Sequence, residues 1–555
     1  MDKITSEASY LTTGVVYTAL PCLILLLATF WTRRRKRVKD LAAFAAAHGC
    51  RPAQKHLSNP WWPPLGLDKA LPTIKADRAG RLPPFMLQEF EKHGHTYTQR
   101  VNGQLVVLTR SPANVHTICK YRFKDYELGA DRAGNFRPLI GHGILSLDGR
   151  EWTRSRAMLR PHFNRSIEQD FVRLEVHVQR LLGRLKANDH GRAIDIADLL
   201  LKLSTDFATQ TVFGHSTDTL VFDMKHWSGE QDKGSAGEFS TALGHALHML
   251  GQRGQLLNFY WLRDSPRFRR SCRTCRAFVG RYLTEAMSGR RSGASNQAKK
   301  SEEEEGQVTT SSQGAISFMH SLVAKETVPT GVMRDQLLSL LLASRDTTAS
   351  FASWVVYALV KHPRVIAKLR GAIQTRLPHG TVPGAADISA LTYLRHVLNE
   401  TMRIFPVVPL NGRTARVDTV LPEGGGEDGQ SPLSVPEGTK IGFNIYALQH
   451  RRDIFGEDAD DFRPERWESD GASGDFEGAF APFILGPRVC LGIVRLLQSL
   501  ERLGPAEAPE STVRTKVTNT SNWPSEETRY DMEDGATTFG IGITMAPRDG
   551  VWVKI

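Results

Sequence analysis

Chemistry is concentrated around one cysteine near the end of the chain. Cys490 lies in a turn that is bounded by glycines and followed by an apolar run, with the sequence Phe483-Ile-Leu-Gly486-Pro-Arg488-Val-Cys490-Leu-Gly492. Backbone N–H groups at a helix start and a neighbouring guanidinium, here that of Arg488, stabilise the thiolate form of a cysteine. A thiolate presented by such a loop can ligate iron, and opposite dioxygen it favours cleavage of the O–O bond. The alternative is a plain buried cysteine in a glycine-containing turn.

A second candidate site is a polar run inside an otherwise apolar segment, Ala343-Ser344-Arg345-Asp346-Thr347-Thr348. Polar side chains lower helix propensity in mid-helix, so this run calls for a reason. The alternative is a solvated polar face, which would carry no chemistry.

Several charged residues stand at spacings that bring side chains together. Glu400 and Arg403 share one face of a helix because they are three residues apart. By itself this is a common surface pair. Arginines usually pair with carboxylates, and further arginines stand at Arg466, at Arg156 four residues after Trp152, and at Arg413 after two prolines.

Taken in chain order, these motifs resemble the cytochrome P-450 family from about residue 60 to the C-terminus. The decapeptide is similar to the haem-binding loop of that family. The resemblance implies a thiolate-ligated haem b, with Cys490 as the axial ligand of the iron. The other loop residues that would bind or shape the cofactor site are Phe483, Gly486, Arg488 and Gly492.

The same resemblance assigns roles to the remaining motifs. Thr347 would hydrogen-bond activated dioxygen and Asp346 would deliver protons to it. Trp152, Arg156 and Arg413 would hold the haem propionates. Glu400, Arg403 and Arg466 would form the Glu-Arg-Arg lock that stiffens the proximal side of the haem. One departure is Ser344, which stands where the family usually has glycine.

Longer stretches resemble the fungal n-alkane and fatty-acid hydroxylase branch of the family. They are Leu147-Asp-Gly149, Ser155-Arg-Ala-Met-Leu-Arg-Pro161, Arg334-Asp-Gln-Leu-Leu338 and Leu421-Pro-Glu-Gly-Gly-Gly426. This resemblance implies a hydrophobic chain substrate, a fatty acid or an n-alkane, that is drawn from the bilayer and oxidised at the ω carbon. Sterol or secondary-metabolite oxidation is the alternative enzyme hypothesis.

The match fails directly after the cysteine loop. Where the family continues with a glutamine- and alanine-rich first part of a helix, this chain continues with Ile493-Val494-Arg495. Roughly eleven residues are missing, which is about 16 Å of helix. A natural deletion and a wrongly joined reading frame both explain the gap. The rival hypothesis is therefore a catalytically impaired or non-catalytic membrane haemoprotein.

Electrons must come from another protein. The chain has no Gly-x-Gly-x-x-Gly motif that opens a βαβ unit and no evident flavin domain, so the resemblance implies an NADPH-dependent flavoprotein reductase as partner. The formal charge of +12 suits an acidic partner or an anionic membrane. Nucleic acid is disfavoured because no zinc-finger, RNP-like or helix-turn-helix pattern is present.

The N-terminus predicts a membrane anchor. No charged residue occurs between Ala8 and Thr32, and five basic residues, Arg33 to Arg37, follow. A bilayer span needs roughly 20 apolar residues, and a cleaved signal peptide has its charges before the apolar run. The positive-inside rule keeps the basic residues and the body in the cytosol, which indicates a single-pass protein of the endoplasmic reticulum membrane. Six cysteines in 555 residues are too few for a disulfide framework, in agreement with a reducing compartment.

The rest of the chain indicates a mainly α fold with small β-sheets, the cytochrome P-450 fold preceded by the transmembrane helix. Apolar spacing predicts helices at Arg165–Lys186, Val332–Lys361 and Leu391–Phe405. Strands are predicted at 105–108 and as hairpin segments at 540–545 and 551–555. The expected domains are an anchor with its basic stop (1–37), a linker (38–59) and a haem-thiolate monooxygenase domain (60–555), in which 288–313 is a disordered surface loop.

Overall fold

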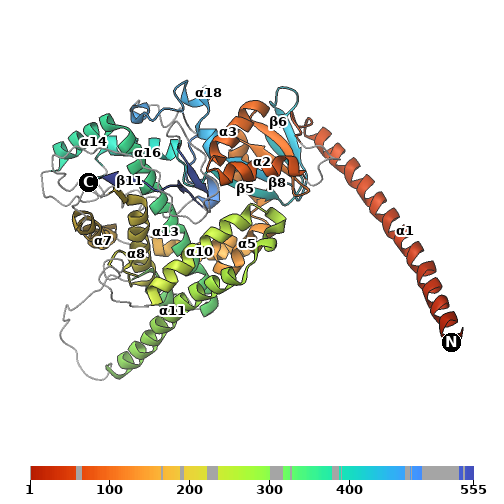
Figure 1. The fold of residues 1–555 in the computed structure, drawn as a ribbon, viewed down its shortest axis with the longest axis horizontal. Coiled ribbons are helices and arrows are strands. Elements are labelled where there is room, and N and C mark those ends of the chain that lie inside the picture. Colours follow the sequence, from red (N-terminus) through yellow and green to blue (C-terminus); the bar gives the residue numbers. More distant parts are fainter. Residues whose placement is uncertain are drawn as a thin grey trace.

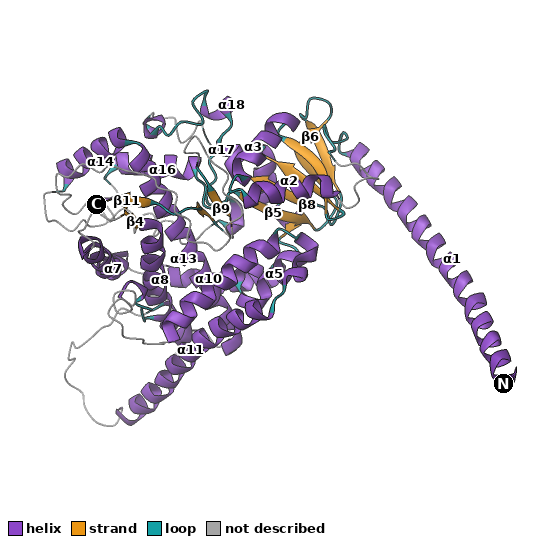
Figure 2. Ribbon diagram, in the orientation of Figure 1, coloured by secondary structure: helices purple, strands orange, loops and turns teal. Residues whose placement is uncertain are grey.

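In the computed structural model most helices fill one side of the molecule, and most strands gather at the other together with α2 and α3, where the N-terminal helix leaves the body (Figure 1, Figure 2). The structure describes residues 2–57, 66–163, 167–187, 193–221, 235–300, 317–325, 328–377, 387–388, 390–468, 476, 478–489, 537–541 and 544–554.

The helices are α1 (Asp2–Ala47), α2 (Leu67–Arg78), α3 (Leu82–His93), α4 (Pro112–His116), α5 (Ala130–Ile140), α6 (Gly149–Leu159), α7 (Ile167–Ala187), α8 (Ile196–Phe213), α10 (Ser235–Gly254), α11 (Pro266–Lys300), α12 (Phe318–Lys325), α13 (Thr330–Lys361), α14 (Pro363–Arg376), α16 (Thr392–Ile404), α17 (Ile445–Gln449) and α18 (Arg452–Phe455). The strands are β1 (Thr96–Val101), β2 (Gln104–Thr109), β3 (Tyr126–Glu127), β4 (Ala193–Asp195), β5 (Leu410–Ala415), β6 (Thr419–Gly425), β7 (Ser431–Val435), β8 (Lys440–Asn444), β9 (Phe539–Ile541), β10 (Met545–Pro547) and β11 (Trp552–Lys554). The mainly helical fold with small sheets is as predicted.

The largest sheet has five strands in the order β1-β2-β8-β5-β3. Strands β2 and β8 run parallel, and the other neighbours are antiparallel. Strand β5 pairs with β8 so that Arg413 lies opposite Ile441. Arg413 is buried, so the sheet holds a guanidinium inside the protein.

Helix α13 passes through the centre of the helical side (Figure 1). It begins directly after Pro329. It ends at Lys361, shortly before Pro363, because proline cannot continue a helix. Buried side chains occur along most of its length, and it packs against α8, α11 and α16. The predicted helix at 332–361 is confirmed, as are those at 391–405 and 165–186 within two residues at each described end. The strand predicted at 105–108 lies inside β2.

Two predictions about the later part of the chain are wrong. The first half of the predicted disordered loop, 288–300, is helical, because α11 continues through Lys300. Extending an existing helix needs no new nucleus, and alanine, glutamine and lysine are good helix formers. The segments 540–545 and 551–555 do not pair with each other. Strand β9 pairs with β10, and β11 pairs with β4.

The predicted linker is also partly structured. Helix α1 extends through Ala47, and the following residues attach to the sheets: the N–H of Arg51 donates to the Pro432 carbonyl (2.9 Å) and that of Leu57 to the Thr98 carbonyl (2.9 Å). The body therefore begins before residue 60. The prolines that suggested that boundary, Pro60, Pro63 and Pro64, lie outside the described residues.

The charge-free segment 8–32 lies within α1. Among the described residues, no helix is long and apolar enough to span a bilayer.

Candidate functional site

The described part of the cysteine loop, 483–489, rests on a short π-helix, Thr117–Tyr121, that directly follows α4. Single π turns are frequent at functional sites. Two predicted site residues, Cys490 and Gly492, lie outside the described residues. Phe483 is partly buried at the edge of the core formed by α7, α8, α13 and α16.

Gly486 makes the closest contact between the loop and the π-helix. Its φ of +72° lies in the left-handed region. A Cβ atom there would stand 1.9 Å from the carbonyl oxygen of Cys119. No other residue type fits this position without moving the loop.

Gly486→Ala is expected to lower the free energy of unfolding by about 2–4 kcal/mol, since it combines an unfavourable φ with a clash against backbone. Denaturant titration of the full chain measures this loss. The matched control is Gly183→Ala in α7, where nothing lies within 4 Å of the added Cβ. That change should stabilise by about 0.5–1 kcal/mol. Equal effects of both substitutions would contradict the tight contact at Gly486.

Arg488 ties the cysteine loop to the segment before α6. Its Nη2 donates to the carbonyl of Leu147 (2.9 Å) and to Oδ1 of Asp148 (2.6 Å). Its guanidinium lies 4.5 Å from the ring centroid of Trp152, which is buried in α6. Arg156 lies 5.6 Å from the centroid of the same ring, and its Nη2 donates to the Val489 carbonyl (3.3 Å).

Two further arginines complete a cluster. Arg413 from β5 is buried, and Arg132 from α5 is partly buried. Both contact Oδ1 of Asn411, Arg413 at 3.0 Å and Arg132 at 3.5 Å. The Nε atoms of both are buried and have no hydrogen-bond partner in the described part of the chain. We call Arg132, Arg156, Arg413 and Arg488 the arginine cluster.

Burial lowers the pKa of three members of the arginine cluster. It lowers the pKa of Arg132 to about 10 and that of Arg488 to about 10, and the pKa of Arg413 is lowered too. Arg413 adds to the lowering at both other positions. Among the described residues, the only carboxylate that opposes the lowering at these three arginines is that of Asp148. Four guanidinium groups and one carboxylate leave a positive excess that suits a ligand with two carboxylates.

Sequence reasoning missed two residues of this site. Arg132 was not identified because no spacing or motif marks it. Asp148 was noted only as part of a family-like stretch. Its side chain accepts hydrogen bonds from the N–H groups of Leu128 (2.9 Å) and Gly129 (3.2 Å), at the start of α5, and from Arg488. The available signal was an acid that directly precedes the helix of Trp152 and Arg156.

The polar run of α13 is accessible although the helix is mostly buried. Ala343 is exposed, and Ser344, Asp346 and Thr347 are partly exposed. Asp346 accepts from Nη1 of Arg345 (2.6 Å). The hydroxyls of Thr347 and Ser344 bond to carbonyls one turn earlier in the helix. Small molecules can therefore reach an acid and a hydroxyl in the middle of α13.

Glu400, Arg403 and Arg466 come together in the core. Glu400 Oε1 lies 2.8 Å from Arg403 Nη2 and 2.8 Å from Arg466 Nε. The Trp467 indole and the N–H of Arg463 also donate to this carboxylate. Burial by itself raises the pKa of Glu400, but the hydrogen bond and charge of Arg403 and the charge of Arg466 outweigh it, so the pKa is lowered.

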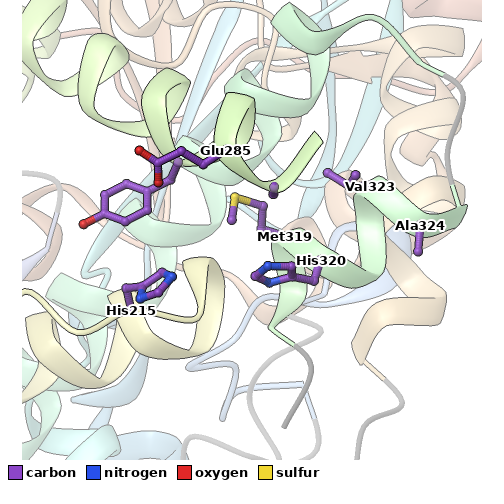
Figure 3. Close-up of a pocket in the computed structure, with 8 residues that line it drawn as sticks. His215, Glu285, Met319, His320, Val323 and Ala324 are labelled. Carbon is purple, nitrogen blue, oxygen red and sulfur yellow. The ribbon is translucent and has the colours of Figure 1, made fainter. Parts of the chain in front are cut away.

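A separate cavity of about 360 Å³ lies between the end of α8, α11 and α12. Figure 3 shows His215 and His320 on either side of it, with Glu285 above. None of the predicted site residues lines it, and among the described residues no group of three or more metal-ligating side chains could hold a metal ion.

The chain is similar to known proteins along most of its length. The family model for cytochrome P450 matches residues 70–494. The chain is 35% identical over 467 residues to cytochrome P450 monooxygenase g430 of a Fusarium species, covering 80% of this chain and 78% of that protein. It is 33% identical to cytochrome P450 52A13 of Debaryomyces hansenii (84% of this chain, 88% of that protein) and 35% identical to cytochrome P450 52A3-B of Candida maltosa (79% and 84%). The predicted resemblance is thus confirmed, and the chain belongs to the cytochrome P450 monooxygenase family.

Proposed function

We propose that this protein is a haem-thiolate monooxygenase that hydroxylates a hydrophobic chain substrate, a fatty acid or an n-alkane, at the ω carbon. The observation that carries the proposal is the arginine cluster. It brings guanidinium groups from α5, α6 and β5 close to Arg488 of the cysteine loop, two residues before Cys490.

The residues present fit haem. The orphaned Nε atoms of Arg132 and Arg413 are donors for carboxylate oxygens, and charge-assisted bonds to haem propionates would satisfy them. Arg156 and Arg488, which both lie against the ring of Trp152, are the other candidates to hold the propionates. Cys490 would ligate the iron, and the bound haem would supply the activation of dioxygen.

Helix α13 would supply the groups that act on dioxygen. Thr347 would donate its hydroxyl hydrogen bond to the reacting oxygen in place of its present bond to the Ala343 carbonyl. Asp346 would deliver protons after its carboxylate releases Arg345. Glu400, Arg403 and Arg466 touch no reacting atom. They would hold the proximal side rigid.

The remaining parts of the proposal concern surroundings and partners. The apolar run in α1 would anchor the protein in the endoplasmic reticulum membrane with the body in the cytosol. Basic residues of this protein, whose formal charge is +12, would dock an NADPH-dependent flavoprotein reductase. The substrate class is supported by similarity to proteins named cytochrome P450 52A13 and 52A3-B and by the family-like stretches noted above.

Arg132→Leu is expected to weaken haem binding about tenfold, because one propionate loses a charge-assisted hydrogen bond. The haem-free chain should be as stable as the wild type or slightly more so, since an incompletely paired guanidinium is removed. Haemin titration and thermal unfolding of the haem-free chain measure the two effects. Arg137→Leu, on an exposed position of the same helix α5, is the control and should change neither.

The proposed function is tested by the ferrous carbon monoxide difference spectrum of the purified full chain. A strongly red-shifted Soret band, followed by NADPH- and reductase-dependent hydroxylation of a fatty acid or alkane, is the expected result. Haem binding without turnover would favour the second candidate, a non-catalytic haemoprotein. That candidate is motivated by the shortened sequence after Gly492. An unshifted band, or no haem, would overturn the monooxygenase proposal.

A further inference from the structure

Two polar side chains near the start of α13 bind the backbone of the α5–α6 connection. Oε1 of Gln336 accepts from the N–H of Ile144 (2.9 Å), and Oδ2 of Asp335 accepts from the N–H of His142 (2.9 Å). Nε2 of Gln336 donates to the carbonyl of His142 (3.1 Å). The side chains of Asp335 and Gln336 are buried, so leaving these hydrogen bonds unmade would be costly.

The connection lies so close to α13 that only glycine fits at two positions. A Cβ on Gly141 would stand 2.0 Å from Oδ2 of Asp335, and one on Gly143 would stand 1.9 Å from Oγ of Ser339. Close backbone approach of this kind is a reason for glycine. The contact between residues 141–144 and α13 is therefore built into the sequence of both segments.

The same two side chains reach the neighbouring helices. Nε2 of Gln336 donates to the hydroxyl of Ser155 in α6 (3.1 Å). Oδ1 of Asp335 pairs with Nη2 of Arg276 in α11 (3.1 Å). Arg276 also donates to the Leu139 carbonyl at the end of α5 (3.3 Å). Asp335 and Gln336 thus join α5, α6, α11 and α13.

The fastened segment continues directly into the arginine cluster. Ser146 donates back to the carbonyls of Gly141 (3.0 Å) and Gly143 (2.9 Å), which closes the turn. The next two residues, Leu147 and Asp148, accept the hydrogen bonds of Arg488. One turn beyond Trp152 on α6 lies Arg156.

From these contacts we propose that Asp335 and Gln336 are positioning residues. They hold residues 141–148 and α6 against α13. This places Asp148, Arg488 and Arg156 where the two arginines can bind the carboxylates of the cofactor. The proposal rests on the proposed function for the identity of that ligand. It explains why a carboxylate and an amide stand next to each other in the buried first half of α13.

Hydrogen–deuterium exchange of the full chain tests the fastening without any turnover. Gln336→Leu removes three hydrogen bonds, and exchange in peptides that cover 141–148 should rise at least tenfold. Ser155→Ala removes only the bond to α6 and should give a smaller rise, which keeps the test usable if Gln336→Leu folds poorly. The matched control is Ser353→Ala, a buried hydroxyl of α13 that bonds within its own helix (2.7 Å).

Haemin titration tests the positioning. Haem affinity should fall about five- to tenfold in Gln336→Leu and stay at the wild-type value in Ser353→Ala. Unchanged exchange in 141–148 would overturn the proposal, as would faster exchange with unchanged haem affinity. A wild-type chain that binds no haem would contradict the proposed function and the positioning role together, whereas the exchange comparison would still decide separately whether α13 fastens the segment.

Discussion

Cys490→Ala is expected to abolish the strongly red-shifted Soret band of the ferrous carbon monoxide complex, because only a thiolate ligand gives the iron this electronic character. Hydroxylation activity should fall to background with it. The absorption difference spectrum of the purified variant, recorded beside the wild type at equal haem content, measures the change.

Haem should still bind to the Cys490→Ala variant, although more weakly, because the arginine cluster does not depend on the sulfur. Cys119→Ala is the matched control. Its thiol is buried beside the same loop, and burial raises its pKa, so it is a poor iron ligand. A spectrum of the Cys490→Ala variant identical to that of the wild type would show that Cys490 is not the iron ligand. It would also contradict the proposed mechanism.

The motifs that stand close together in sequence were the easiest part of the site to predict. Glu400 and Arg403 are one helical turn apart, and a helix places them on one face whatever the rest of the fold does. The polar run Asp346-Thr347 stood out because its residues oppose the apolar pattern of α13. Local rules of this kind also predicted α13 and α16 within two residues.

Some of the parts that depend on tertiary contacts were missed. Nothing near Arg132 marks it, since the hydrogen-bond acceptor that it reaches, Asn411 in β5, lies 279 residues later. Asp148 precedes α6, where an aspartate usually caps the helix, but its side chain makes no cap bond and turns to Leu128 and Arg488 instead. The predicted pairing of the final strands was wrong because β11 pairs with β4, which lies more than 350 residues earlier and which local spacing cannot indicate.

Glu400→Gln is expected to lower the free energy of unfolding by about 3–5 kcal/mol, since it leaves two buried guanidinium groups without their counter-charge. Glutamine keeps the shape of the side chain, so lost packing contributes little. The carboxylate accepts hydrogen bonds from Arg403, Arg466, Arg463 and Trp467, and glutamine cannot accept all of them. Denaturant titration of the wild type and the variant, fitted with one shared m-value, measures the loss.

The matched control is Glu468→Gln. Glu468 pairs with Lys368 at 2.8 Å, but about half of each side chain is exposed, so the loss should be at most about 1 kcal/mol. A similar small loss at Glu400 would contradict the lock.

The lock also makes an acid-dependent contribution to stability. The pKa of Glu400 is lowered in the folded protein from its ordinary value of 4.5. The ionised carboxylate therefore contributes its full share to the free energy of unfolding above pH 4.5, and this share is lost as the pH falls through the pKa of the folded state. Stability of the wild type should therefore decline more steeply below about pH 4.5 than that of Glu400→Gln. Parallel pH profiles of the two proteins would show that Glu400 is already protonated in the core, and the ion-pair account of the proximal side would fail.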